Sequence, residues 1–129
     1  MATRSTIAIE REDGSVSQIY CHWDGYLDHV GKILKQYYNT AGTVEALIAL
    51  GAVSSLDKSI EKPEGHTFSS AYDGYTVFYG RDRGDKDMEA NRYQSFKEYF
   101  LDHDFEDYNY IFKDGQWHYA RNEGGFSTY

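Results

Sequence analysis

Four Asp-Gly pairs are the feature of this 129-residue sequence that most constrains its fold. Both residues of such a pair tolerate positive φ angles, so the pair suits the tight turn of a β-hairpin. Two of the pairs lie between segments in which apolar and polar residues alternate. Asp13-Gly14 separates TIAIERE from SVSQIYCHW, and Asp114-Gly115 separates DYNYIFK from QWHYAR. The sequence therefore predicts two β-hairpins, one near each end of the chain.

Further strands and helices are predicted between the hairpins. Alternation predicts a strand over 75–80 and a shorter one over 91–95. Apolar residues recur at helical spacing in three segments, each with a capping residue before it: 26–39 after Asp24, 44–51 after Thr43, and 96–102 after Ser95. The segment 59–73 shows little periodicity and is predicted to be a long loop. The predicted fold class is α+β, an antiparallel or mixed sheet built from two β-hairpins and central strands, with two to three helices packed on one face.

The length fits a single domain over residues 1–129, and 13 Tyr, 7 Phe and 2 Trp supply volume for its core. No stretch approaches the roughly 18 apolar residues that a membrane span needs, and the N-terminus has no apolar signal region. The only cysteine, Cys21, has no partner for an internal disulfide. These features predict a cytoplasmic protein that makes no membrane contact.

The formal net charge of −8 is unevenly distributed. Residues 63–129 hold 7 basic and 13 acidic groups, whereas residues 1–62 hold 6 and 8. A protein that binds nucleic acid directly usually carries the opposite sign, so nucleic acid is not an expected partner. The acidic groups either keep a small protein soluble or imitate nucleic acid in a basic groove of another protein.

The heptapeptide YCHWDGY concentrates chemically versatile side chains, but strand alternation separates them. Cys21 and His22 point to opposite faces of a strand and make a poor catalytic pair. Cys21 is expected to be buried on the same face as Trp23, while His22 either faces solvent or pairs with Tyr20 and a carboxylate. One functional interpretation stays open, because a strand-to-helix corner places backbone N–H groups beside His22 and Tyr26, where an anion can bind.

The stretch YGRDRGDKD is the second dense segment. Arg81 and Arg83, in a glycine-bounded loop, are suited to gripping a phosphate or carboxylate. Alternatively they are neutralised by Asp82, Asp85 or Asp87. On the first interpretation, the candidate ligand-binding residues are His22, Trp23, Tyr26, Arg81 and Arg83, which supply stacking faces and anion donors for a nucleotide.

No motif supports metal binding, catalysis or a cofactor. The acidic residues after Arg81 do not match a calcium-binding loop, and the five histidines lack zinc-ligand spacing. Phosphate-binding loops, nucleophile elbows and C-x-x-C pairs are missing from the sequence. We therefore predict no metal ligand, no catalytic residue and no cofactor. A small hydrolase with His22 or His118 as general base is the least supported alternative.

An acidic stretch with aromatic residues follows the last predicted helix. Its candidate protein-interaction residues are Asp102, Asp104, Phe105, Glu106 and Asp107. Carboxylates around aromatic rings are typical of protein-binding surfaces, but the stretch also suits a helix end whose aromatic rings belong to the core.

The strings STIAIEREDGSVSQIYCHWDGY, HVGKIL and YGRDRG together resemble a set of small proteins encoded by bacteriophages, prophages and some bacteria. The resemblance covers the first 50 residues well and the remainder through GRDRG and YNYIFKDGQW. It implies no activity or catalytic residue. It implies a context, a small phage accessory protein acting in the host cytoplasm.

Two functional hypotheses follow. The first is a non-enzymatic binding protein that inhibits a host defence component, for example a CRISPR effector, by protein–protein contact. The second is a sponge that sequesters a nucleotide or phosphate-bearing signal. Gly31 in mid-helix also indicates a close approach of another segment, within the fold or across a homodimer.

Overall fold

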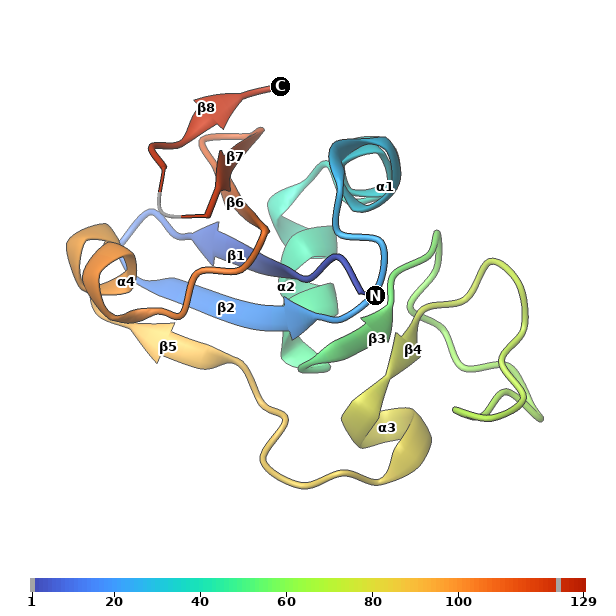
Figure 1. Cartoon of the computed structure of the whole chain (residues 1–129). Helices are drawn as coiled ribbons and strands as arrows, with labels where there is room; N and C mark the ends of the chain where they lie inside the picture. The colour runs from blue at the N-terminus through green and yellow to red at the C-terminus, as the bar shows by residue number, and fades with distance from the viewer. Residues whose placement is uncertain (1, 123) are drawn as a thin grey trace.

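The computed structural model describes residues 2–122 and 124–129. Within them, two hairpins form the centre of a mixed eight-stranded sheet (Figure 1). β1 (Ser5–Glu10) pairs antiparallel with β2 (Val16–Cys21), and β6 (Tyr108–Lys113) pairs antiparallel with β7 (Gln116–Arg121). Both predicted hairpins are confirmed. β1 and β6 lie side by side in parallel, which joins the hairpins into one sheet.

The second hairpin shows why an Asp-Gly pair specifies this turn. Asp114 and Gly115 have φ angles of 51° and 76°. Two consecutive positive φ angles match the right-handed twist of the flanking strands. In the first hairpin only Gly14 has a positive φ, of 89°. This turn is closed by a hydrogen bond from the Arg11 N–H to the Ser15 carbonyl.

Short strands extend the sheet on both sides, in the order β4-β3-β2-β1-β6-β7-β8, with β5 also paired to β2. They are β3 (Val53–Ser55), β4 (Val77–Phe78), β5 (Asn91–Tyr93) and β8 (Ser127–Thr128). The strand predicted over 75–80 is therefore shorter than expected, and it lies at the edge of the sheet instead of its centre. The chain turns directly from β4 into a short helix, α3 (Tyr79–Arg83).

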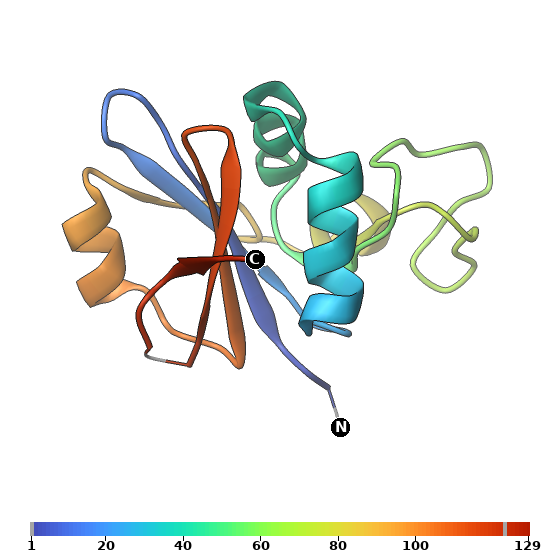
Figure 2. The same cartoon turned by 90° about the horizontal axis from the view of Figure 1, so that it is seen from above.

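Two helical segments cover one face of the sheet (Figure 2). A π-helical turn, η1 (Leu27–Gly31), continues into α1 (Lys32–Tyr37), and α2 (Ala41–Ala49) follows. Their apolar residues pack on alternate residues of β1 and β2 in the main core. The members of this core that are fully buried are Ile7, Cys21, Val30, Leu34, Val44, Leu47, Val53, Phe78 and Tyr110.

The third predicted helix, α4 (Phe96–Asp102), packs on the opposite face. Its buried Tyr99 contacts a smaller cluster formed by Ala8, Val16 and Ile111. The α+β class and the mixed sheet are thus as predicted, and the helices cover both faces because β1 and β6 present apolar side chains on both.

The helix caps differ in part from the predictions. Ser95 caps α4 as predicted, since its hydroxyl accepts a hydrogen bond from the Glu98 N–H at 3.1 Å. α2 begins earlier than predicted, and its cap is Thr40, which forms a reciprocal capping box with Thr43. Asp24 caps nothing, because it adopts a φ of 56° and the helical segment begins only after Tyr26.

The position of Gly31 is explained within the chain. A Cβ atom there would lie 3.2 Å from both the Tyr110 hydroxyl and a methyl group of Leu27. Tyr110 needs this space, because its buried hydroxyl donates to the Gly25 carbonyl at 2.7 Å. Tyr129 donates to the Gly31 carbonyl at 2.8 Å from another side. A homodimer is not needed to account for this glycine.

Candidate functional site

The YCHWDGY stretch has a structural role at Cys21. The thiol is fully buried, and burial raises its pKa to about 12, so it is unreactive at neutral pH. His22 points away from it and pairs with Tyr20, whose hydroxyl lies 2.7 Å from His22 Nδ1. The expectation that Trp23 shares the buried face of Cys21 is wrong. β2 ends at Cys21, strand alternation stops there, and Trp23 is 45% exposed.

The YGRDRG stretch is a helix, not the predicted loop, and both of its arginines are paired. Asp82 stabilises this helix, since its carboxylate accepts the N–H of Phe78, the residue directly before α3, at 2.8 Å. Arg81 donates to Asp82 at 3.0 and 3.2 Å. Arg83 donates to both carboxylate oxygens of Asp85, at 2.9 and 2.7 Å. The alternative of mutual neutralisation describes this segment.

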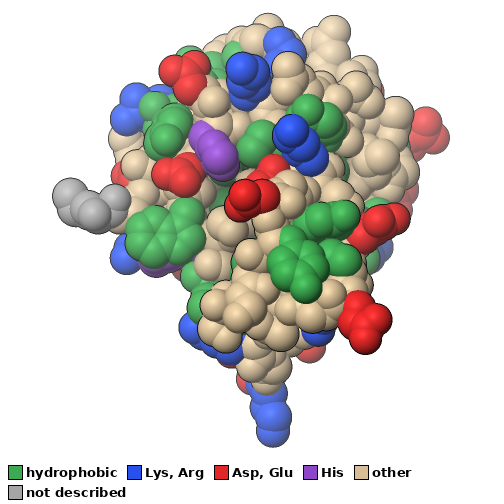
Figure 3. All heavy atoms as spheres, turned by 90° about the vertical axis from the view of Figure 1, so that its right-hand side faces the viewer, with side chains coloured by type: hydrophobic (Ala, Val, Ile, Leu, Met, Phe, Trp, Pro, Cys, Tyr) green, Lys and Arg blue, Asp and Glu red, His purple; other side chains and the backbone are tan. Residues whose placement is uncertain are grey.

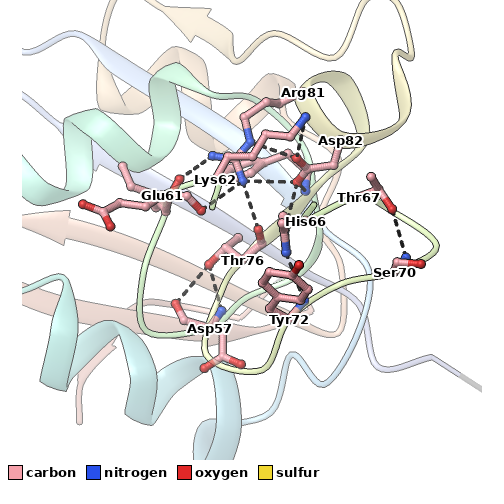
Figure 4. Close-up of polar contacts among 12 residues, drawn as sticks. Asp57, Glu61, Lys62, His66, Thr67, Ser70, Tyr72, Thr76, Arg81 and Asp82 are labelled. Carbon is pink, nitrogen blue, oxygen red and sulfur yellow. Dashed lines mark hydrogen bonds and ion pairs between the residues drawn. The ribbon is translucent and has the colours of Figure 1, made fainter. Parts of the chain in front are cut away.

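Asp82 is the centre of a buried charge network (Figure 4). Its side chain is 0% exposed and contacts three basic groups. Besides Arg81, Lys62 Nζ lies at 3.9 Å and His66 Nε2 at 3.7 Å from its carboxylate. Burial by itself would raise the pKa of Asp82, but these hydrogen bonds and charges outweigh it and hold the pKa below its ordinary value. Asp82 is therefore a buried, ionised carboxylate.

His66 belongs to this network and is not placed for catalysis. Its Nδ1 accepts the Tyr72 N–H at 3.1 Å, so the neutral ring carries its proton on Nε2, which faces Asp82. The side chain is fully buried, so neither nitrogen meets a substrate. A general base needs a nitrogen within reach of the proton it removes. The pair instead fixes the long loop before β4 against α3.

Arg81 also holds this loop. It donates to the carbonyls of Ile60, Glu61 and Thr76, at 3.5 Å for Glu61 and 3.3 Å for Thr76. Its guanidinium lies 4.7 Å from the centre of the Phe78 ring. On the face of the molecule that carries the loop, acidic, basic and hydrophobic side chains are interspersed (Figure 3). This face thus offers no broad surface of one charge.

The five predicted ligand-binding residues do not line a common cleft. Of the five, Arg83 alone lines a hollow of about 460 Å³ beside β2, together with Tyr20 and Tyr79. The Arg81 guanidinium already donates hydrogen bonds to Asp82 and to backbone carbonyls, among them that of Thr76. His22, Trp23 and Tyr26 follow the C-terminal end of β2 and do not line this hollow, although His22 contacts one lining residue, with its Nδ1 2.7 Å from the Tyr20 hydroxyl. Sequestration of a nucleotide by this set stays a prediction, without support from the geometry.

The predicted protein-interaction residues do form a continuous surface feature. We call it the acidic-aromatic surface and define it as Phe100, Leu101, Asp102, Asp104, Phe105, Glu106 and Asp107. Three of its carboxylates, on Asp102, Asp104 and Asp107, are exposed. Within residues 2–122 and 124–129, none of its four carboxylates has a cationic side chain within 4.0 Å. No ion pair within this distance compensates these charges, although Arg4 acts on the pKa of Glu106 and the Arg121 guanidinium donates to the Asp107 carbonyl at 3.2 Å.

Apolar side chains stand among these carboxylates. Leu101 is 68% exposed, the largest exposed fraction among the large hydrophobic residues described. The rings of Phe100 and Phe105 meet edge to face, with centroids 5.5 Å apart. Together with His103 and Asn122 they line an open hollow of about 730 Å³. The alternative interpretation, in which the aromatic rings of this stretch belong to the core, holds for Tyr108, which packs against the main core, but not for Phe100 and Phe105, which are half-buried outside both clusters.

The backbone under this surface is held by a buried amide. The Asn109 side chain accepts from the Glu106 N–H at 3.1 Å and donates to the Glu106 carbonyl at 3.0 Å. The His103 ring stacks on the Tyr99 ring, with centroids 4.1 Å apart, and its centroid lies 4.0 Å from that of Phe105. Burial raises the pKa of the Glu106 carboxyl, and Asp107 and Asp104 add to this effect although Arg4 opposes it. The surface is thus preformed and strongly acidic.

No group of three or more His, Cys, Asp or Glu side chains in the described part of the chain is arranged to hold a metal ion. None of the helices described there is long and apolar enough to span a membrane. His118 lies on β7 opposite Ile111, and its proposed role as a base stays untested.

No protein-family model, curated protein or solved structure matches the chain. Sequence reasoning missed the His66–Asp82 pair and the hollow beside β2. The first joins residues 16 positions apart through an irregular loop, and the second depends on how three short elements meet, so neither leaves a periodic signal.

Proposed function

We propose that this protein is a non-enzymatic inhibitor that binds a host defence protein, such as a CRISPR effector, through the acidic-aromatic surface. The observation that carries the proposal is the set of four carboxylates, none with a cationic side chain within 4.0 Å in the described part of the chain, around exposed Leu101 and half-buried Phe105. A surface of this composition complements a basic groove that normally holds nucleic acid.

The charge supports a basic partner. Unpaired carboxylates on one surface raise the rate of encounter with a positively charged groove and disfavour acidic partners. Apolar and aromatic side chains at the centre then supply contact area, since binding energy concentrates in a few buried anchors. Leu101 and Phe105 are the anchors that the surface offers.

The resemblance to phage-encoded proteins supplies the biological context. A phage protein in a bacterial cell meets defence nucleases whose nucleic-acid grooves are basic. An acidic protein that occupies such a groove inhibits by exclusion and needs no catalytic residue. This mode of action predicts inhibition at a fixed molar ratio, in contrast to turnover.

The first experiment expresses the protein in bacteria that each carry one defence system and counts plaques of a phage that the system restricts. The proposal predicts that plaque numbers rise at least tenfold for one system. Purified protein should then inhibit that system's effector with a titration endpoint near a fixed stoichiometric ratio. Inhibition by a small molar fraction of the protein would indicate an enzyme and contradict the proposal.

A matched pair of variants locates the binding surface. Asp102→Asn/Asp104→Asn/Asp107→Asn removes three charges from the acidic-aromatic surface and should weaken inhibition at least tenfold. Glu12→Gln/Glu61→Gln/Glu64→Gln removes three exposed carboxylates elsewhere and should leave inhibition within twofold. Equal losses in both variants would mean that net charge, and not this surface, drives binding.

A further inference from the structure

A second site lies on the outer edge of β2, where two strands diverge. β3 pairs with β2 at Cys21, and β5 pairs with the same edge over Val16–Gln18. Ile19 and Tyr20, between these points, pair with neither strand. The segment from α3 to β5 passes below β2 and β3 in Figure 1 and closes the far side. The result is a cleft of about 460 Å³, a volume typical of small-ligand sites.

The far wall of this cleft is fixed in position. The Ala52 N–H donates to the Met88 carbonyl at 2.8 Å. This contact requires a glycine at position 51, because a Cβ atom there would lie 2.3 Å from the Met88 carbonyl oxygen. At the other end, Asp85 N–H donates to the Tyr79 carbonyl at 3.1 Å. The wall is thus anchored on both sides, and the cleft exists without a ligand to organise it.

The lining combines aromatic, thioether and acidic groups. Tyr20, Tyr79 and Met88 supply half-buried apolar surface, and Asp87 and Glu89 supply exposed carboxylates. Among the residues the structure describes, neither carboxylate has a cationic side chain within 4.0 Å.

The one basic residue of the lining is already engaged. Arg83 forms two hydrogen bonds with Asp85, and its guanidinium lies near the ring centres of both Phe68, at 4.5 Å, and Tyr79, at 4.9 Å. Three carboxylates against one paired guanidinium leave the cleft with an excess of two negative charges. A phosphate would be repelled here.

We propose that this cleft binds an organic cation, an ammonium or guanidinium group carried on an aliphatic stem. The cationic group would meet Asp87 and Glu89 beside the Tyr79 ring, which already attracts the Arg83 guanidinium, since aromatic rings attract cations. The stem would lie against Tyr20 and Met88, which a bare metal ion would leave unused. The site is separate from the acidic-aromatic surface and does not depend on the function proposed for that surface.

The test uses three probes of the same size and different charge: n-butylammonium, n-butanol and butyrate. Two-dimensional NMR of the isotope-labelled protein follows the Met88 methyl group and the side-chain amides of Gln18 and Asn91. We expect n-butylammonium to cause saturable chemical-shift changes at these groups, with a dissociation constant at least tenfold lower than that of n-butanol. Equal binding of n-butanol, tighter binding of butyrate, or shifts confined to other parts of the chain would overturn the proposal.

Variants separate this site from attraction to the net charge of the protein. Asp87→Asn/Glu89→Gln should weaken n-butylammonium at least tenfold, whereas Asp102→Asn/Asp104→Asn, with the same change in charge, should alter it less than twofold. Tyr79→Leu keeps apolar volume but loses the ring, and should weaken binding several-fold with an unchanged amide spectrum elsewhere. Equal effects of the two charge variants would refute the site.

A second pair of probes identifies the source of the cation. Agmatine represents a free amine, and Nα-acetyl-lysine N-methylamide represents a side chain within a protein. Tighter binding of agmatine assigns the cleft to small amines, and comparable binding of the lysine derivative assigns it to a basic side chain of a partner. Absence of binding by both would contradict the proposal.

Discussion

The segment 79–85 and the acidic-aromatic surface are both rich in charged side chains, but they differ in whether these side chains form ion pairs. In the first, every charge meets a partner: Arg81 with Asp82, and Arg83 with Asp85. In the second, exposed Asp102 and its neighbouring carboxylates have no such partner in the part of the chain that the structure describes. The difference teaches that density of charge in a sequence does not mark a binding site. What matters is whether the charges are compensated within the fold.

The largest effect should come from removing the buried carboxylate. Asp82→Ala leaves Arg81 and His66 without their charged partner and the Phe78 N–H without its acceptor. We therefore expect the free energy of unfolding to fall by about 3 to 5 kcal/mol. Urea denaturation followed by circular dichroism measures this loss. Asp85→Ala removes a carboxylate from an exposed pair and serves as the control, with a much smaller change. Similar losses in the two variants would break the comparison.

The same carboxylate should make stability depend on acidity. The pKa of Asp82 is lower in the folded chain than its ordinary value of 3.8, so its contribution to stability is present above pH 3.8 and is lost as the pH falls through the folded value. Between pH 5 and pH 2, denaturation should therefore show the stability of Asp82→Asn falling less steeply than that of the natural sequence. Parallel curves would show that folding does not lower the pKa of Asp82.

The crowded glycine at position 31 gives an effect of intermediate size, outside both charged regions. Alanine favours helices over glycine by about 1 kcal/mol, but its methyl group would press on Tyr110 and Leu27. Overpacking costs about 1 to 3 kcal/mol, so Gly31→Ala should be neutral to destabilising by about 2 kcal/mol. Thermal denaturation at equal protein concentrations measures it. A clear gain in stability would show that the space beside Gly31 is open.

The smallest effect on stability should come from the acidic-aromatic surface. Asp104→Asn removes an exposed charge that has like-charged neighbours, so the free energy of unfolding should change by no more than about 0.5 kcal/mol, or rise slightly. The same urea titration detects this. A loss above about 2 kcal/mol would mean that Asp104 supports the fold, and would remove the contrast with Asp82.

Local patterns predicted the parts of the fold whose cause is local. The Asp-Gly pairs gave both hairpins, and Ser95 marked the start of α4. The Cys21 thiol was correctly expected to be buried, because it lies within an alternating strand. For Trp23 the same alternation misled, since β2 ends two residues earlier and no sequence signal marks that end.

Elements created by tertiary contacts were not predictable in the same way. β3 has three residues, and its pairing with Cys21 depends on the position at which the chain leaves α2. In α3 the Asp82 carboxylate accepts the N–H of the preceding Phe78, a contact that alternating charges in the sequence do not indicate. The cleft beside β2 is formed by β3, β5 and the segment between α3 and β5. These segments are far apart in the sequence, so the cleft could be found only in the folded structure. The surface from Asp102 to Asp107 was found because its residues are contiguous.

Hydrogen exchange of the protein, alone and bound to the effector that it inhibits, tests the central claim most directly. Mass spectrometry of peptic peptides would cover both regions in one experiment. We predict slower exchange over residues 99–107 in the complex and unchanged exchange over 78–85, whose charges are compensated within the fold. Protection over 78–85, with 99–107 unchanged, would contradict the account.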